Sequence, residues 1–174
     1  PTWISEAILN VLDEYLKPSG GFRSHPELLK KVLELKNDEG FRRALWLAHQ
    51  ENKKKLAQLL HQWKIKDDCL TIAWARRIAA YKRPSLIFQD LQHLIEMAKR
   101  IGPLQILYAG KAHPNDNLAF TYINEIMNTI DKADEANGFL KIVMLENYDI
   151  YIAKILVSSV DIWLNNPLPP NEAS

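Results

Sequence analysis

The stretch "CLTIAWARRIAAYKR" (residues 69–83) decides how the second half of the chain folds. Its first six residues are mostly apolar, which is typical of a strand buried on both faces. Four cations follow, at Arg76, Arg77, Lys82 and Arg83. The next segment, "PSLIFQDLQHLIEMAKR", has the spacing of a helix. The sequence therefore predicts a strongly basic corner between a buried strand and a helix.

Three more short apolar segments follow along the chain. "LQILYAG", "KIVML" and "DIWLN" are predicted strands, and helices are predicted at about residues 83–100, 115–137 and 149–158. Strands that alternate with helices at this spacing form βαβ units, whose strands are parallel. We therefore predict an α/β domain over residues 67–174, with a parallel, Rossmann-like sheet flanked by helices. The strand order does not follow from the pattern.

The first third of the chain is predicted to be a helical lead-in over residues 1–66. "SEAILNVLDEYL" begins with Ser5 as a helix cap, and "HPELLKKVLEL" carries Pro26 in its first turn. "DEGFRRALWLAHQENKKKLAQLLHQW" is the longest helical pattern, and we expect its "ENKKK" to face solvent. No pattern in this segment predicts chemistry.

Composition limits the classes of partner. Lys and Arg number 22 against 21 Asp and Glu, which gives a net charge of +1. This balance predicts neither a nucleic-acid-binding nor a membrane-binding protein, so any anion site must be local. A single cysteine, Cys69, favours a reducing compartment, and we expect a cytoplasmic protein. No apolar run approaches the roughly 20 residues of a membrane helix, and no metal-ligand pattern occurs.

The segments that follow the four strands hold the candidate site, because ligands collect at the carboxyl ends of parallel strands. They are "ARRIAAYKR", "GKAHP", "ENYD" and "NNPLPPNEAS". Arg77 and Lys82 could both reach one anion, with arginine matching phosphate oxygens as a planar fork. A solvated basic corner is an equally good interpretation of these two residues. No Gly-rich dinucleotide or nucleotide-triphosphate loop is present.

The other strand ends carry weaker signals. His113 could act as a general acid or base, although a helix-capping or surface role is favoured. Asp149 is either a helix cap or a site residue. Glu172 could accept hydrogen bonds from sugar hydroxyls, and the prolines of its segment favour a stiff loop held against a ligand.

These segments resemble the α-glucan (glycogen or maltodextrin) phosphorylases. The resemblance lies in "ARRIAAYKR", "LYAGKAHPND", "VMLENYDIYIAKILV", "VDIWLNNPLPPNEAS" and, more weakly, the opening "PTWIS". It is strongest over residues 71–174 and is nearer to the shorter bacterial and archaeal branch. It implies an enzyme with two facing Rossmann-like domains (the GT-B architecture), of which this chain would supply the first half of the second.

The resemblance also implies a reaction. Such enzymes use orthophosphate to release glucose 1-phosphate from the terminal α-1,4-linked glucose of a glucan, with retention of configuration. Their cofactor is pyridoxal phosphate, which is bound to a lysine and acts through its phosphate. They are cytoplasmic and commonly homodimers. The expected partners are thus phosphate, an α-1,4-glucan and the missing parts of the same enzyme.

Individual residues carry over from the resemblance. Arg77 resembles the arginine that holds the substrate phosphate, and Lys82 resembles the lysine beside both phosphates. Arg76 and Tyr148 resemble cofactor-pocket residues. The expected sugar-binding residues are Tyr81, Glu172, Ala173 and Ser174. The basic corner would then exist because two mutually repelling phosphates lie side by side there.

Some positions depart from the family pattern. Asp149 stands where animal enzymes have an arginine, and Leu168 and Pro169 replace a pair of arginines found in many relatives. The family continues after "EAS" with a segment that contains the cofactor lysine. We expect both chain ends to be cuts inside a longer protein and the isolated chain to be inactive, with a processed start and a flexible tail as the alternative.

Two other functions stay open from the sequence. One is a sugar-nucleotide-dependent glycosyltransferase of the same GT-B architecture, similar to glycogen and starch synthases. The other is a non-catalytic module that binds phosphate or glucan. The intact "RR…YKR" pattern favours a working site over a decayed one.

Overall fold

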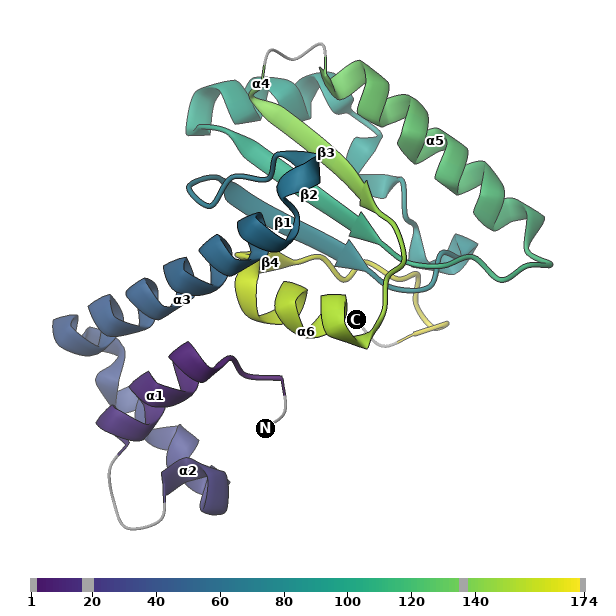
Figure 1. The fold of residues 1–174 in the computed structure, drawn as a ribbon. Helices are drawn as coiled ribbons and strands as arrows, with labels where there is room; N and C mark the ends of the chain where they lie inside the picture. Colours follow the sequence, from purple (N-terminus) through teal and green to yellow (C-terminus); the bar gives the residue numbers. More distant parts are fainter. Residues whose placement is uncertain (1–2, 17–20, 135–137, 173–174) are drawn as a thin grey trace. The chain divides into compact units, whose positions relative to one another are not determined.

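A computed structural model describes residues 3–16, 21–134 and 138–172 of the chain (Figure 1). The chain forms two compact units. The first comprises Pro1–Asp67 and Lys154–Ser159, and the second comprises Asp68–Ala153 and Val160–Ser174. Among the described residues, no helix combines the length and the apolar character that crossing a membrane requires.

The second unit is built on a four-stranded, entirely parallel sheet with the strand order β3-β2-β1-β4 (Figure 1). Its strands are β1 (Leu70–Ala75), β2 (Leu104–Ala109), β3 (Leu140–Leu145) and β4 (Ile162–Trp163). All six residues of β2 are buried, as a central strand requires. The predicted α/β class and parallel sheet are therefore confirmed.

β4 is shorter than the predicted strand "DIWLN". Its two residues pair with Ile72 and Ala73 of β1 at the edge of the sheet, and both are exposed. The chain then turns away from the ladder towards Pro167, which has no N–H group to donate to a neighbouring strand. Because β4 has only two residues, the segment that follows it leaves the edge of the sheet and can approach the basic corner.

One face of the sheet packs on helices α4 (Leu91–Ile101) and α5 (Asn117–Asp134). Alternate strand residues, such as Ile106 and Tyr108 of β2, share one hydrophobic cluster with Leu94 of α4 and Ile126 of α5. This period of two is the signature of a strand with distinct faces. Trp74 stacks on Tyr108 in the cluster, with ring centroids 5.2 Å apart.

The predicted helix over residues 83–100 begins later than expected. Two short 3₁₀ turns, η3 (Ala80–Lys82) and η4 (Leu86–Phe88), come first, and α4 begins only after Asp90, whose carboxylate caps the His93 N–H at 2.9 Å. Arg83 has a left-handed φ of 48° and Pro84 follows it. Neither residue fits a helix interior, which explains the delay. The third predicted helix is α6 (Ile150–Ser159), where Asp149 acts as the N-cap through the Ile152 N–H.

The first unit is helical as predicted. It contains α1 (Glu6–Tyr15), α2 (Gly21–Ser24), η1 (Pro26–Asn37), α3 (Glu39–Leu59) and η2 (His61–Trp63). Ser5 caps α1 through the Ile8 N–H, as predicted. The segment with Pro26 in its first turn is a 3₁₀ run rather than an α-helix, and none of its residues is buried.

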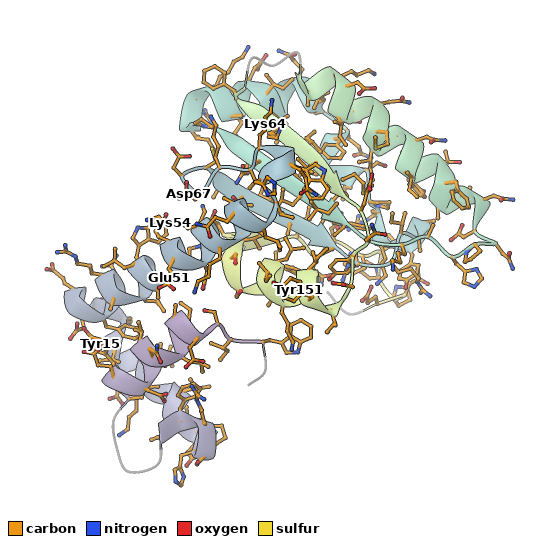
Figure 2. All side chains as sticks on the ribbon, viewed as in Figure 1. Tyr15, Glu51, Lys54, Lys64, Asp67 and Tyr151 are labelled. Carbon is orange, nitrogen blue, oxygen red and sulfur yellow. The ribbon has the colours of Figure 1, made fainter. Side chains whose placement is uncertain are left out.

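The "ENKKK" segment of α3 is only partly the solvent face that we expected. Glu51 and Lys54 are exposed and extend outward from the helix (Figure 2). Asn52 and Lys53 are buried instead. The Asn52 amide donates hydrogen bonds to the Ser5 hydroxyl (2.8 Å) and to the Ser158 carbonyl (3.1 Å). These long-range partners compensate for the burial of a polar side chain.

Candidate functional site

The basic corner is held against the loop that follows β2. The Arg76 N–H donates to the Ala109 carbonyl (3.0 Å), and the Ile78 N–H donates to the Lys111 carbonyl (3.1 Å). Pairing of β1 with β2 thus continues beyond both strands. A Cβ atom at Gly110 would lie 2.0 Å from the Arg76 carbonyl oxygen. Only glycine allows this approach, so the turn predicted at Gly110 positions the cation-bearing corner.

A cavity of about 360 Å³ lies where three strand ends meet. Its lining residues are Arg76, Arg77, Lys111, Ala112, His113, Pro114 and Tyr148. The corner after β1, the loop after β2 and the segment after β3 therefore contribute to one concavity. Four of its lining residues are permanent or potential cations from two different loops, and this favours an anionic ligand.

Arg76 is the most constrained cation of the site. Its side chain is only 14% exposed, and Nη2 lies 3.5 Å from Oε1 of Glu172. Among the described residues, Nη1 is buried and has no hydrogen-bond partner. A buried, unpaired guanidinium N–H is unfavourable by about 1–3 kcal/mol or more. A ligand oxygen at this position would satisfy it.

Arg77 and Tyr81 lie next to each other at the surface. Arg77 Nη2 donates to the Tyr81 hydroxyl oxygen at 2.9 Å. This hydrogen bond stabilises the phenolate and lowers the pKa of Tyr81, and the charge of Lys82 acts in the same direction. Lys82 Nζ also lies 5.0 Å from the centroid of the Tyr81 ring. The arrangement orients the Arg77 guanidinium without neutralising it.

Lys82 and Glu172 form an ion pair with Nζ 2.5 Å from Oε2. The Lys82 side chain is only 9% exposed. Lysine is almost never buried without a partner for its charge, and Glu172 is that partner here. The hydrogen bond from Lys82 lowers the pKa of Glu172, with Arg76 adding a smaller electrostatic effect. Each carboxylate oxygen therefore faces a different cation. The sugar-binding role of Glu172 stays a prediction.

The remaining predicted site residues are placed as follows. Tyr148 lines the cavity, and partial burial raises its pKa. His113 lines it too, and its Nδ1 accepts a hydrogen bond from the Asn115 N–H at 3.2 Å, within the turn before α5. The cap of α5 is instead Asp116, whose carboxylate accepts from the Ala119 N–H, so His113 is a surface residue and not a helix cap.

Tyr81 and Glu172 lie outside the lining but contact Arg77 and Arg76, respectively. Lys82 also lies outside the lining and contacts Glu172 and the Tyr81 ring. Ala173 and Ser174 lie outside the described residues.

The sequence pattern did not predict the roles of Arg83 and Asn166. Arg83 donates to the carbonyls of Asn166 (2.8 Å) and Pro167 (3.3 Å), so this fourth cation of the corner is engaged by the backbone. Asn166 bonds in turn to the Arg83 carbonyl and to the buried Trp74 indole. No local sequence pattern predicts these contacts, because the partners are 83 to 92 residues apart. In the part of the chain that the structure describes, no cluster of metal-ligand side chains occurs.

Comparison with known proteins agrees with this geometry. The family model for carbohydrate phosphorylases matches residues 3–174. The chain is 34% identical to the glycogen phosphorylase of Aquifex aeolicus over 99% of its own length and 27% of that protein. It is 33% identical to the maltodextrin phosphorylase of Thermococcus litoralis, covering 99% of the chain and 22% of that protein. The chain thus spans about a quarter of the length of these relatives. On this evidence, the chain belongs to the carbohydrate phosphorylase family.

Proposed function

We propose that this chain supplies the phosphate-binding wall of an α-glucan phosphorylase. The whole protein would cleave the terminal α-1,4-linked glucose of a glucan with orthophosphate and release glucose 1-phosphate with retention. One observation carries the proposal: Arg76 and Arg77 line one cavity, and the unpaired, buried Nη1 of Arg76 lacks an acceptor among the described residues. Phosphate oxygens match the planar fork of a guanidinium, as carboxylate oxygens do, and a phosphate carries more negative charge.

The proposed phosphate ligands come from one corner. Arg77 would bind the substrate phosphate, with its guanidinium oriented by Tyr81. Lys82 follows Arg77 by five positions and would lie beside both the substrate and cofactor phosphates. Two phosphates repel each other strongly at short range, so a cluster of cations lowers the energy of bringing them together. The stabilisation is most useful where negative charge develops in the transition state.

The residues of this chain also fit the phosphate of pyridoxal 5′-phosphate. Arg76 offers a buried nitrogen without an acceptor, and Tyr148 lines the same cavity as a half-buried phenol. These two residues would hold the cofactor phosphate and orient it. When bound, the cofactor would supply its phosphate as the acid–base group of the reaction.

The sugar would be bound by residues that border the cations. Glu172 would accept hydrogen bonds from glucose hydroxyls, and Tyr81 would lie near the 2-hydroxyl. Ala173 and Ser174 would add backbone N–H donors. Because Glu172 contacts Arg76 and Lys82, the sugar and phosphate sites would share a boundary.

A titration of the isotope-labelled chain by NMR tests the anion site. Inorganic phosphate and glucose 1-phosphate should shift the backbone signals of Lys111, which lines the cavity, and of Ile78, whose N–H is bonded to the Lys111 carbonyl. Arg77→Met and Lys82→Met should each weaken phosphate binding at least tenfold, since a hydrogen bond to a charged group contributes roughly 1.5–3 kcal/mol. Lys99→Met is the matched control, because Lys99 is exposed on α4.

Two results would contradict the proposal. One is a phosphate titration that shifts no signal near the cavity, or that shifts it equally in Lys82→Met. The other is a much tighter interaction with ADP-glucose than with phosphate or glucose 1-phosphate. That result would favour the sugar-nucleotide-dependent glycosyltransferase.

A further inference from the structure

The segment after β4 is joined to the basic corner by a set of reciprocal hydrogen bonds. Asn166 Oδ1 accepts from the Trp74 indole Nε1–H at 3.0 Å, and Asn166 Nδ2 donates to the Arg83 carbonyl at 3.0 Å. Trp74 is fully buried in β1. One amide therefore links the sheet core, the end of the corner and the segment after β4. We call the contacts of Asn166 with Trp74 and Arg83 the Asn166 brace.

The side chain of Arg83 adds hydrogen bonds of its own to the segment after β4. Its Nε and Nη2 donate to the carbonyls of Asn166 (2.8 Å) and Pro167 (3.3 Å). The Leu168 N–H donates to the Tyr81 carbonyl at 2.7 Å. A guanidinium fork satisfies two successive carbonyls at once, which a lysine ammonium cannot do with the same geometry. The brace therefore fixes the direction in which the chain leaves Asn166.

The two chain segments that the brace joins also carry the two members of an ion pair. Lys82 directly precedes Arg83, and Glu172 follows Asn166 by six residues. Lys82 and Glu172 are 90 residues apart in the sequence, yet their charged atoms are in contact. Holding two chain segments together next to an ion pair reduces the entropy lost when the pair forms.

We propose that Asn166 is a positioning residue, whose brace holds the Glu172 carboxylate on Lys82 and Arg76 so that an incoming phosphate must displace it. The proposal rests on the proposed function, because it assigns phosphate to those same cations. Glu172 is then an internal competitor, and phosphate binding releases its carboxylate for other hydrogen bonds. Ligands that require a free Glu172 should bind more tightly once phosphate is present, by thermodynamic reciprocity.

The relative charges make such a competition possible. A carboxylate carries one negative charge and a phosphate dianion carries two, so both are attracted to the same two cations. The Glu172 side chain is 33% exposed, which leaves a path for exchange with solvent anions. Removing its charge should therefore tighten phosphate binding about threefold to tenfold, the range of a partly exposed charge pair.

The experiment is a double-mutant cycle on phosphate affinity, measured by NMR titration of the full chain. Glu172→Gln should tighten inorganic phosphate binding threefold to tenfold. Asn166→Ala should tighten it about twofold to threefold, because Glu172 is held less well. In the Glu172→Gln background, Asn166→Ala should change the affinity by less than about 1.5-fold. Asn165→Ala is the matched control, since Asn165 is the exposed neighbour of the same type.

A second readout tests the brace without any ligand. The Trp74 indole N–H should exchange with solvent at least tenfold faster in Asn166→Ala than in wild type or Asn165→Ala, because it loses its acceptor. Arg83→Lys keeps the charge but loses the fork. It should reproduce the Asn166→Ala affinity change, and it replaces that variant if Asn166→Ala does not fold.

Several outcomes would overturn the inference. It is wrong if Glu172→Gln weakens phosphate binding, or if Asn166→Ala has the same effect with and without the Glu172 carboxylate. Unchanged exchange of the Trp74 indole N–H would also contradict it. If wild type binds no phosphate, the proposed function fails and so does the competition, while the indole exchange still decides whether the brace exists.

Discussion

Tyr81 illustrates how a single contact sets the chemistry of a residue at this site. The hydrogen bond from Arg77 lowers the pKa of its phenol below the ordinary value of 10.0. Arg77→Met removes both the donor and a positive charge, so the pKa of Tyr81 should rise. The measurement is an alkaline titration of phenolate absorbance, in which Tyr81 is isolated by subtracting the curve of Tyr81→Phe. Arg100→Met, an exposed change on α4, should leave the Tyr81 step where it is.

The ionisation of Glu172 makes the free energy of unfolding depend on pH in the acid range. Its pKa in the folded chain lies below the ordinary value of 4.5, chiefly because Lys82 donates a hydrogen bond to it. A depressed folded pKa contributes stability above pH 4.5, and this contribution is lost as the pH falls through the folded value. Glu172→Gln should therefore have a shallower loss of stability below that pH than wild type.

Urea unfolding midpoints at neutral pH and at successively lower pH values measure this effect. Glu146→Gln is the control, because Glu146 is exposed at the end of β3. If wild type and Glu172→Gln lose stability in parallel across the acid range, the ion pair with Lys82 does not contribute as described.

At the scale of elements, the site depends on the close approach of the two chain segments that follow β1 and β2. Gly110→Ala would place a Cβ atom 2.0 Å from the Arg76 carbonyl oxygen and should destabilise the chain by about 3 kcal/mol or more. Gly102→Ala is the matched control. Gly102 has a φ of 115° but no atom within 4 Å of its Cβ position, so backbone strain alone should lower stability by about 1–2 kcal/mol.

Chemical denaturation of the two glycine variants gives the comparison. Gly110→Ala should also weaken phosphate binding, since the displaced backbone carries Arg76. Equal destabilisation by both substitutions would mean that the loop after β2 moves freely away from the corner.

For the whole molecule, the important feature is a local cation cluster in a chain of nearly balanced charge. The net charge is +1, so attraction of anions to the surface as a whole is weak. Phosphate should nevertheless raise the thermal midpoint, because it binds the folded state at one site. At ten times its dissociation constant the stabilisation is about 1.4 kcal/mol, or roughly 3–6 °C for a chain of this size.

Calorimetry in phosphate and in chloride of equal ionic strength separates specific binding from screening. Lys82→Met should reduce the difference between the two salts to about a third or less, whereas Lys99→Met should retain it. An equal rise in both salts would show that the ions act on the surface in general.

The sequence by itself determined the fold class and the chemical character of the site. Short apolar strands alternating with amphipathic helices are local patterns, so the parallel sheet and the helical first unit could be predicted from neighbouring residues. The caps at Ser5 and Asp149 depend on contacts three residues away and were readable for the same reason. The basic corner was visible because Arg76, Arg77 and Lys82 lie close together in the chain.

Only the tertiary structure decided how those charges are used. Glu172 pairs with Lys82 across 90 residues, and Arg83 is engaged by carbonyls 83 and 84 residues away. These partners meet because the strand order places β4 beside β1. No local sequence pattern predicts that order. The late start of α4 and the brevity of β4 have a local origin instead, because Pro84 does not fit a helix interior and Pro167 cannot donate to a neighbouring strand.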